Sequence, residues 1–186
     1  MTTPASMILR FRWRTALAAL VLALAACGPV TEPPKPANDS GWREFAGSWN
    51  ATGNRRTIPL GADRRGSIID LKGSMLLAGP GRPGVGFRSE VLALNDSATG
   101  LTGRSVWTDE HGDQVFSELK GEGTAAKNHI TGTFLGGTGR YAGVTGNYEF
   151  SWQFVIEAED GSIQGRAVGL NGRFRLGQTT PGGTQP

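Results

Sequence analysis

Residues 130–150, ITGTFLGGTGRYAGVTGNYEF, decide the fold of this chain, because they predict two strands joined by a glycine-rich corner. Alternation places Ile130, Gly132 and Phe134 on one face of the first strand, and it resumes from Val144 onward. Glycine can adopt positive φ and permits close backbone approach, which a sharp corner between strands requires. The corner glycines are Gly136, Gly137, Gly139 and Gly143.

The remainder of residues 42–176 predicts an antiparallel meander of about eight strands. Short alternating segments are separated by turn-forming residues, and no long amphipathic helical segment interrupts them. The clearest hairpin joins residues 101–108 to 114–121, whereas residues 54–65 are expected to form a polar, basic loop. An open meander has two exposed edges, and closure removes both. The sequence therefore predicts an all-β fold with a closed antiparallel eight-stranded barrel.

The corner also carries a family resemblance. The segment TGTFLGGTGRYAGVTG resembles the strand–corner–strand signature of the allene oxide cyclase and dirigent barrels, through Gly136, Gly137, Thr138, Gly139, Tyr141, Gly143 and Gly146. The resemblance is sharp here and only architectural elsewhere. It implies a lipocalin-like barrel with an apolar cavity, often assembled as a trimer. Plant members cyclise or couple small hydrophobic molecules, but no plant active-site residue is matched outside the corner, so none is carried over.

The N-terminus predicts export. Arg10, Arg12 and Arg14 precede an apolar run, TALAALVLALAA, which is short for a membrane span and ends at Cys27. Residues 1–26 resemble a bacterial lipoprotein signal peptide, and the resemblance implies that acylated Cys27 anchors the mature chain to a membrane. Gly28, in place of an aspartate, favours the outer membrane of a Gram-negative cell, with the protein facing the periplasm. The alternative is an ordinary signal peptide with an incidental cysteine.

Composition assigns the flanking segments and limits the partners. Residues 27–41 predict a proline-rich linker, residues 42–176 the barrel, and residues 177–186 a disordered tail. Three of the 19 Lys and Arg residues precede Cys27, so the 16 that remain balance the 16 Asp and Glu residues. The mature chain is formally neutral, which removes the main support for nucleic-acid binding.

An aromatic series on one strand supplies candidate ligand-binding residues. Tyr148, Phe150, Trp152 and Phe154 alternate with polar residues, which makes one face of the strand apolar. Core packing is the favoured interpretation, and the wall of a ligand pocket is the other; in a small barrel the same surface can serve both purposes. The aromatic candidates for ligand binding are Trp107, Phe116, Tyr148, Phe150 and Trp152.

Four charged residues form a second candidate group, namely Arg88, Glu90, Arg104 and Glu118. They lie on three successive predicted strands, and in-register pairing would place them in a charged ladder. Outside the barrel such a ladder is a solvated surface, and this interpretation is favoured. Inside, it would orient a ligand or act in acid–base chemistry.

No motif predicts a metal, a cofactor or a catalytic group. His111 and His129 have no ligand spacing, and with Cys27 as the only cysteine neither an intrachain disulfide nor a cysteine-rich metal site can form. The segment GPGRPG at residues 79–84 matches the spacing of a glycine-rich phosphate-binding loop. A strand is predicted after it, so it lacks the helix N-terminus that binds the phosphate in such loops. We therefore expect binding of a small hydrophobic ligand or an envelope partner. The alternatives are an isomerase or cyclase acting in the cavity and a purely structural envelope lipoprotein.

Overall fold

The computed structural model describes residues 41–80, 84–122 and 129–177. The predicted signal peptide, the predicted lipidation site at Cys27, the linker before Gly41 and the tail beyond Gly177 lie outside the described residues. Within them, no helix is long and apolar enough to cross a membrane.

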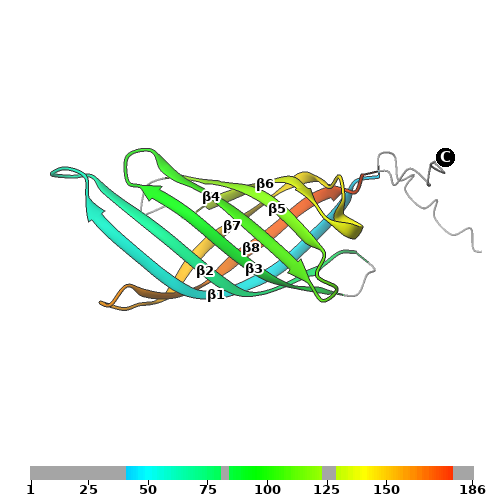
Figure 1. The fold of residues 1–186 in the computed structure, drawn as a ribbon, viewed down its shortest axis with the longest axis horizontal. Helices are drawn as coiled ribbons and strands as arrows, with labels where there is room; N and C mark the ends of the chain where they lie inside the picture. Colours follow the sequence, from blue (N-terminus) through cyan, green and yellow to red (C-terminus); the bar gives the residue numbers. More distant parts are fainter. Residues whose placement is uncertain (1–40, 81–83, 123–128, 178–186) are drawn as a thin grey trace, which may run out of the picture. The chain divides into compact units, whose positions relative to one another are not determined.

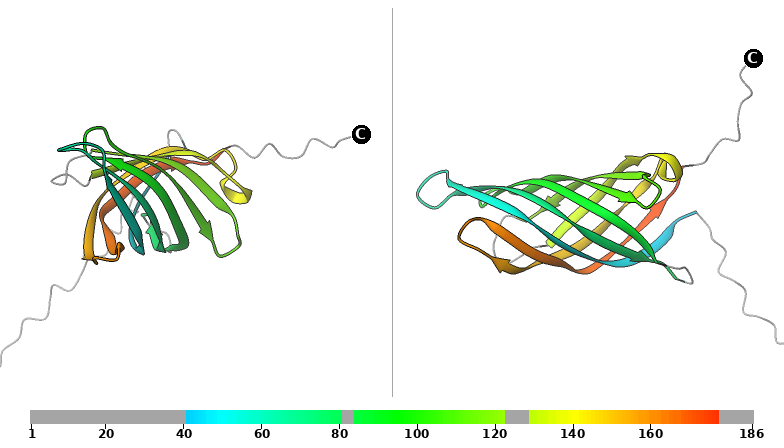
Figure 2. Two further views of the ribbon diagram at one scale, coloured as in Figure 1. Left: turned by 60° about the vertical axis from the view of Figure 1, so that its left-hand side comes forward. Right: turned by 60° about the horizontal axis from the view of Figure 1, so that its bottom comes forward.

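Eight antiparallel strands form a closed barrel, which confirms the predicted architecture (Figure 1). The strands are β1 (Arg43–Pro59), β2 (Arg65–Ala78), β3 (Val85–Asp96), β4 (Gly100–Asp109), β5 (Gln114–Gly121), β6 (His129–Gly137), β7 (Thr145–Glu157) and β8 (Ser162–Arg175). Each strand pairs with the next in sequence, and β1 pairs with β8 to close the sheet. The strands run obliquely around the barrel, as Figure 2 shows from two sides.

Alternation along each strand separates the interior from the outer face. On β1, for example, Phe45, Trp49 and Ala51 are buried, whereas Asn50 and Thr52 are exposed. The buried apolar side chains of all eight strands form one core cluster. Aromatic rings occupy much of it, with Trp107 in contact with four others, Phe45, Phe87, Phe134 and Tyr148, at centroid distances of 4.8–6.5 Å.

One predicted loop is in fact largely a strand. Residues 54–65 were expected to form a polar loop, but β1 continues to Pro59 and pairs with β2 throughout, from Asn54 opposite Asp70 to Pro59 opposite Arg65. Polar composition misled the prediction, because the cross-strand hydrogen bonds continue beyond the apolar core. The inward alternation continues as well, which gives this extension its role in the site described below.

The glycine corner between β6 and β7 contains a short 3-10 helix, Gly139–Tyr141, and its positive-φ glycines are the residues that the corner requires. Gly139 has φ +49°, and a β-carbon there would lie 1.8 Å from Oδ1 of Asp113. The close approach exists because the corner is fastened to the β4–β5 turn. Arg140 Nη2 lies 2.7 Å from Oδ2 of Asp109, whose side chain is fully buried.

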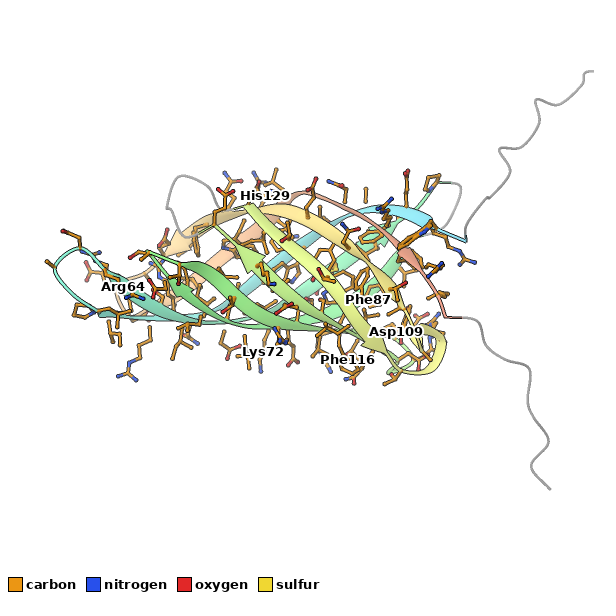
Figure 3. All side chains as sticks on the ribbon, turned by 90° about the horizontal axis from the view of Figure 1, so that it is seen from above. Arg64, Lys72, Phe87, Asp109, Phe116 and His129 are labelled. Atoms are coloured by element: carbon orange, nitrogen blue, oxygen red, sulfur yellow. The ribbon has the colours of Figure 1, made fainter. Side chains whose placement is uncertain are left out.

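The barrel has two different ends. The corner end carries the glycine corner and both ends of the described chain, since Arg43 pairs with Phe174 and Thr145 pairs with Arg175. The opposite end, the cavity end, carries the β1–β2, β3–β4 and β7–β8 turns. Figure 3 shows Arg64 and Asp109 at these two ends. The unit of residues 38–186 contains all of the described strand pairings and core contacts, so we expect it to fold as a separate polypeptide.

Candidate functional site

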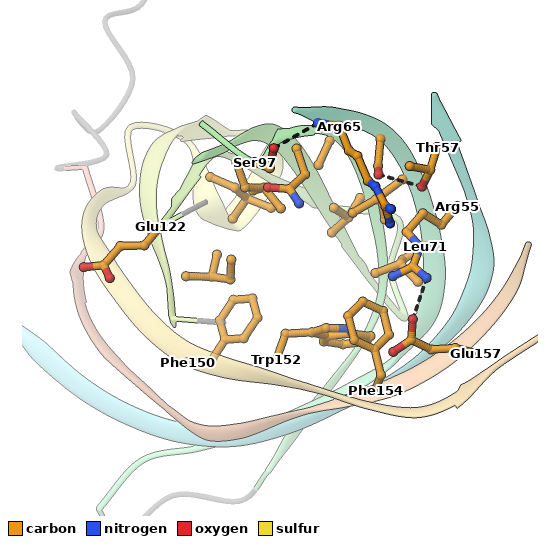
Figure 4. Close-up of a pocket in the computed structure, with 18 of the residues that line it drawn as sticks. Arg55, Thr57, Arg65, Leu71, Ser97, Glu122, Phe150, Trp152, Phe154 and Glu157 are labelled. Atoms are coloured by element: carbon orange, nitrogen blue, oxygen red, sulfur yellow. Dashed lines mark hydrogen bonds and ion pairs between the residues drawn. The ribbon is translucent and has the colours of Figure 1, made fainter. Parts of the chain in front are cut away.

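A cavity of about 460 Å³ opens at the cavity end of the barrel (Figure 4). The apolar part of its lining, here called the cavity floor, comprises Trp49, Ile69, Leu71, Val91, Ala93, Leu101, Leu119, Ile130, Phe150, Trp152 and Phe154. This volume lies within the range of ligand pockets, which enclose an apolar body and present few polar groups. The barrel can therefore accommodate one small molecule at this end.

Polar side chains surround the entrance to the cavity. This group, the cavity mouth, consists of Arg55, Thr57, Arg65, Ser67, Asn95, Ser97, Glu122 and Glu157. Most of them come from the ends of β1, β2 and β3, where inward alternation continues beyond the apolar core. Thr57 Oγ1 and Ser67 Oγ share one hydrogen bond of 2.8 Å, and Ser67 is buried.

Three arginines lie near the mouth, and they differ in their partners. Arg64 is paired with Asp96, and hydrogen bonding from Arg64, assisted by the Ala98 N–H, lowers the pKa of Asp96 to about 2. Arg55 is paired with Glu157 and lies over the Phe154 ring, 5.3 Å from its centroid.

Arg65 is the exception. It is inward-facing by its register on β2, and its backbone N–H donates to Ser97 Oγ at 2.9 Å. Among the residues that the structure describes, its guanidinium has neither a hydrogen-bond partner nor a carboxylate partner. In Figure 4 the Arg65 side chain extends from the rim towards the cavity, on the same side as Arg55.

Glu157 reaches the mouth through an irregularity in the β7–β8 pairing. Regular alternation from Trp152 and Phe154 would place Ile156 inside. The register shifts between Phe154 and Ile156, so Ile156 is exposed and Glu157 pairs with the buried Ile163. The charge that neutralises Arg55 therefore depends on this register shift.

Beneath the cavity the interior is packed and contains a buried cluster of hydroxyl groups. Ser117 Oγ lies 2.6 Å from Ser105 Oγ and 2.7 Å from the Tyr148 hydroxyl. Burial raises the pKa of Tyr148 to about 12, although the hydrogen bonds from the two serines act in the opposite direction. A void of only about 10 Å³ remains in this region, so the ligand-sized space ends above the cluster.

The four interior aromatic candidates occupy different depths. Phe150 and Trp152 belong to the cavity floor. Trp107 and Tyr148 are buried in the packed middle, 4.8 Å apart between ring centroids. Core packing and pocket lining, the two interpretations that the sequence left open, thus both occur along β7.

The other five candidates lie outside the barrel interior. Phe116 is half-buried on the outer face of β5, whereas the residues on either side of it, Val115 and Ser117, are buried inside the barrel. The charged residues lie on the outer faces of β3, β4 and β5 and form two ion pairs, Arg88 with Glu90 at 3.5 Å and Arg104 with Glu118 at 3.2 Å. The side chains of Arg88 and Arg104 are 69% and 61% exposed, which identifies a solvated ladder.

A second, smaller hollow of about 130 Å³ lies at the corner end. Phe45, Phe87, Trp107 and Phe174 contribute to its largely apolar lining, and Tyr141 covers it from the corner. Across residues 41–80, 84–122 and 129–177, no three His, Cys, Asp or Glu side chains are placed to hold a metal ion.

Comparison of the chain with protein-family models, with curated proteins and with solved structures finds no match. The geometry of the cavity is therefore the basis for a functional proposal.

Proposed function

We propose that this chain is a lipid-anchored cell-envelope protein whose barrel binds a small hydrophobic ligand in the cavity end. The proposal rests on one observation. The middle of the barrel interior is filled by side chains, whereas a cavity of about 460 Å³ remains open at the cavity end. A barrel with a purely structural role gains stability by filling that space with side chains.

The chemistry of the floor favours an apolar ligand body. Trp49 and Trp152 lie 5.0 Å apart between ring centroids, and Ile69 and Leu71 line the β2 side of the cavity. Each buried methylene group of a ligand contributes about 0.8 kcal/mol by leaving water. We infer that affinity comes chiefly from this apolar burial.

The finer parts of the proposal rest on sequence resemblance. Residues 136–146 support an allene oxide cyclase-like subtype of barrel and, through it, a trimer. The order of charge, apolar run and Cys27 supports acyl anchoring to the outer membrane on its periplasmic side. An isomerase or cyclase acting on a small apolar substrate is the second function that the same resemblance supports.

Native mass spectrometry of the unit comprising residues 38–186 tests the cavity function. The delipidated unit is offered an extract of bacterial envelope lipids and metabolites, and we expect one discrete added mass per chain. Ala93→Phe places a ring inside the cavity and should abolish the added mass. The matched control Ala46→Phe carries the same change at an exposed position of β1 and should retain it.

A clean apo mass under all conditions would contradict the proposal and direct attention to an envelope protein as the partner. Because isomerisation leaves mass unchanged, chromatography of the released ligand against the original extract distinguishes binding from conversion. The same spectra report whether the unit is a monomer or a trimer.

A further inference from the structure

We propose that the ligand is an amphiphile whose head group is an anion, a carboxylate or a phosphate monoester, which Arg65 receives at the cavity mouth while the apolar body lies on the floor. This inference rests on the proposed ligand-binding function and specifies the chemical class of the ligand. The evidence is the arrangement of charges and hydroxyl groups on β1 and β2.

Arg55 and Arg65 flank a pair of hydroxyl groups. The β1–β2 register places Arg55 opposite Ile69, Thr57 opposite Ser67, and Pro59 opposite Arg65. Inward-facing residues of the two strands therefore follow one another as a cation, the Thr57–Ser67 pair and a second cation. All four side chains line the same cavity.

The two hydroxyl groups leave a donor available. Thr57 and Ser67 share one hydrogen bond, in which only one of the two O–H groups donates. The other hydrogen can point to an acceptor on a ligand. Together with the guanidinium of Arg65, it provides the donors that an oxyanion accepts.

The carboxylates of the mouth do not cancel the positive charge at Arg65. Glu157 is paired with Arg55. Figure 4 shows Glu122 across the entrance from the two arginines, with its carboxylate directed away from the cavity. The cation that remains for a ligand is therefore Arg65, at the point where an apolar body leaves the cavity.

Titration calorimetry with three probes of equal chain length tests this proposal on the unit comprising residues 38–186. The probes are dodecanoate, dodecyl phosphate and the neutral dodecanol, all below their aggregation concentrations. We expect the anions to bind about threefold to tenfold more tightly than the alcohol at low salt, and the preference to shrink as salt rises. Whether dodecanoate or dodecyl phosphate binds more tightly identifies the anion.

Arg65→Glu should remove the preference for the anions while leaving dodecanol affinity within about twofold, since the floor is unchanged. Arg56→Glu is the matched control, because it makes the same charge change on the outer face of β1, and it should preserve the preference. Arg65→Gln should lower the preference without reversing the local charge. Retained dodecanol binding shows that each variant is folded.

Equal binding of the alcohol and the anions, or a preference that survives Arg65→Glu, would overturn the inference and leave the cavity function intact. If none of the three probes binds while the envelope extract still gives an added mass, the inference fails and the cavity function stands; if the extract gives no added mass either, both fail.

Discussion

Ser89 and Ser117 are buried to the same extent, but their hydroxyl groups differ in their hydrogen-bond partners. Ser89 and Ser117 are each 1% exposed. Ser117 Oγ contacts Ser105 and Tyr148, whereas Ser89 Oγ has no hydrogen-bond partner among the described residues. A buried hydroxyl group without a hydrogen-bond partner destabilises the folded state, whereas one with two partners stabilises it.

Alanine substitution should therefore affect the two serines unequally. We expect Ser117→Ala to lower the free energy of unfolding by about 1–3 kcal/mol, because it leaves the Tyr148 hydroxyl with fewer partners. Ser89→Ala should be neutral or stabilising, within about 1 kcal/mol. Urea denaturation of both variants measures this difference. An equal loss for both would show that Ser89 has a partner, such as a buried water in the adjacent void.

Asp109 should make the stability of the fold depend on pH in the acidic range. Burial alone would raise the pKa of its carboxyl group, but the N–H groups of His111 and Asp113, the Tyr141 hydroxyl and the Arg140 guanidinium outweigh it, and the pKa is lowered. A carboxyl group with a lowered folded-state pKa stabilises the fold above its unfolded pKa of about 3.9. That contribution is lost as the pH falls through the folded-state value.

Asp109→Asn should accordingly lower the free energy of unfolding by about 1–3 kcal/mol at pH 7, because it removes the charge that pairs with Arg140. The difference between wild type and variant should narrow as the pH falls below the unfolded-state value of about 3.9 and through the lowered folded-state pKa, because the wild-type carboxyl group then gains a proton. Denaturation curves across this range test the expectation. A difference that stays constant with pH would exclude Asp109 as the responsible group.

At the scale of elements, the glycine corner acts as a fastening between β6, β7 and the β4–β5 turn. Arg140 contacts both Asp109 and Asp113 of that turn, and Thr138 N–H donates to the Gln114 carbonyl. The corner therefore contributes to the shape of this end of the barrel, and none of residues 136–146 lines the proposed ligand cavity.

Gly139→Val should damage folding and not ligand binding alone. A β-branched residue at φ +49° is strained, and its β-carbon would overlap the Asp113 carboxylate. We expect a loss of about 2–4 kcal/mol in the free energy of unfolding. Gly86→Val is the control, since a β-carbon there meets nothing within 4 Å. A fully stable Gly139→Val barrel that had lost its ligand would contradict this role for the corner.

The elements were largely predictable from local pattern, but the composition of the mouth was not. Alternation and turn residues predicted eight strands and closure. The aromatic series on β7 predicted an apolar inner face, with core packing favoured over a pocket wall. Arg55 and Arg65 were missed because residues 54–65 resemble a loop by composition. Their parity with Trp49 and Leu71 was the available signal.

Two further features depend on information that no single segment contains. The position of Glu157 follows from a register shift that only the pairing with β8 defines. Arg88, Glu90, Arg104 and Glu118 were predicted as a set, but neither face of the middle strand, residues 101–108, was clearly apolar. Their outward orientation follows from closure of the whole sheet.

At the scale of the whole molecule, one substitution tests the proposed anchoring to the membrane. Cys27→Ala removes the sulfur that would be acylated, and with it the apolar burial that holds such an anchor in a bilayer. We expect the variant to move from the membrane fraction to the soluble fraction after cell lysis, as followed by immunoblotting. The Ser97→Ala variant, altered far along the chain, should remain with the membrane. Membrane retention of Cys27→Ala would contradict the lipoprotein proposal.

The pairing of β1 with β8 bears on whether the barrel tolerates circular permutation of its chain. Because Arg43 and Phe174 lie opposite each other, a short linker could join the native ends of the barrel at the corner end. New ends could then be opened at the β7–β8 turn beside Gly161, beyond the last residue that lines the cavity. A circular permutant of this kind preserves every strand neighbour, so chain order should be dispensable for the barrel once the sheet is closed.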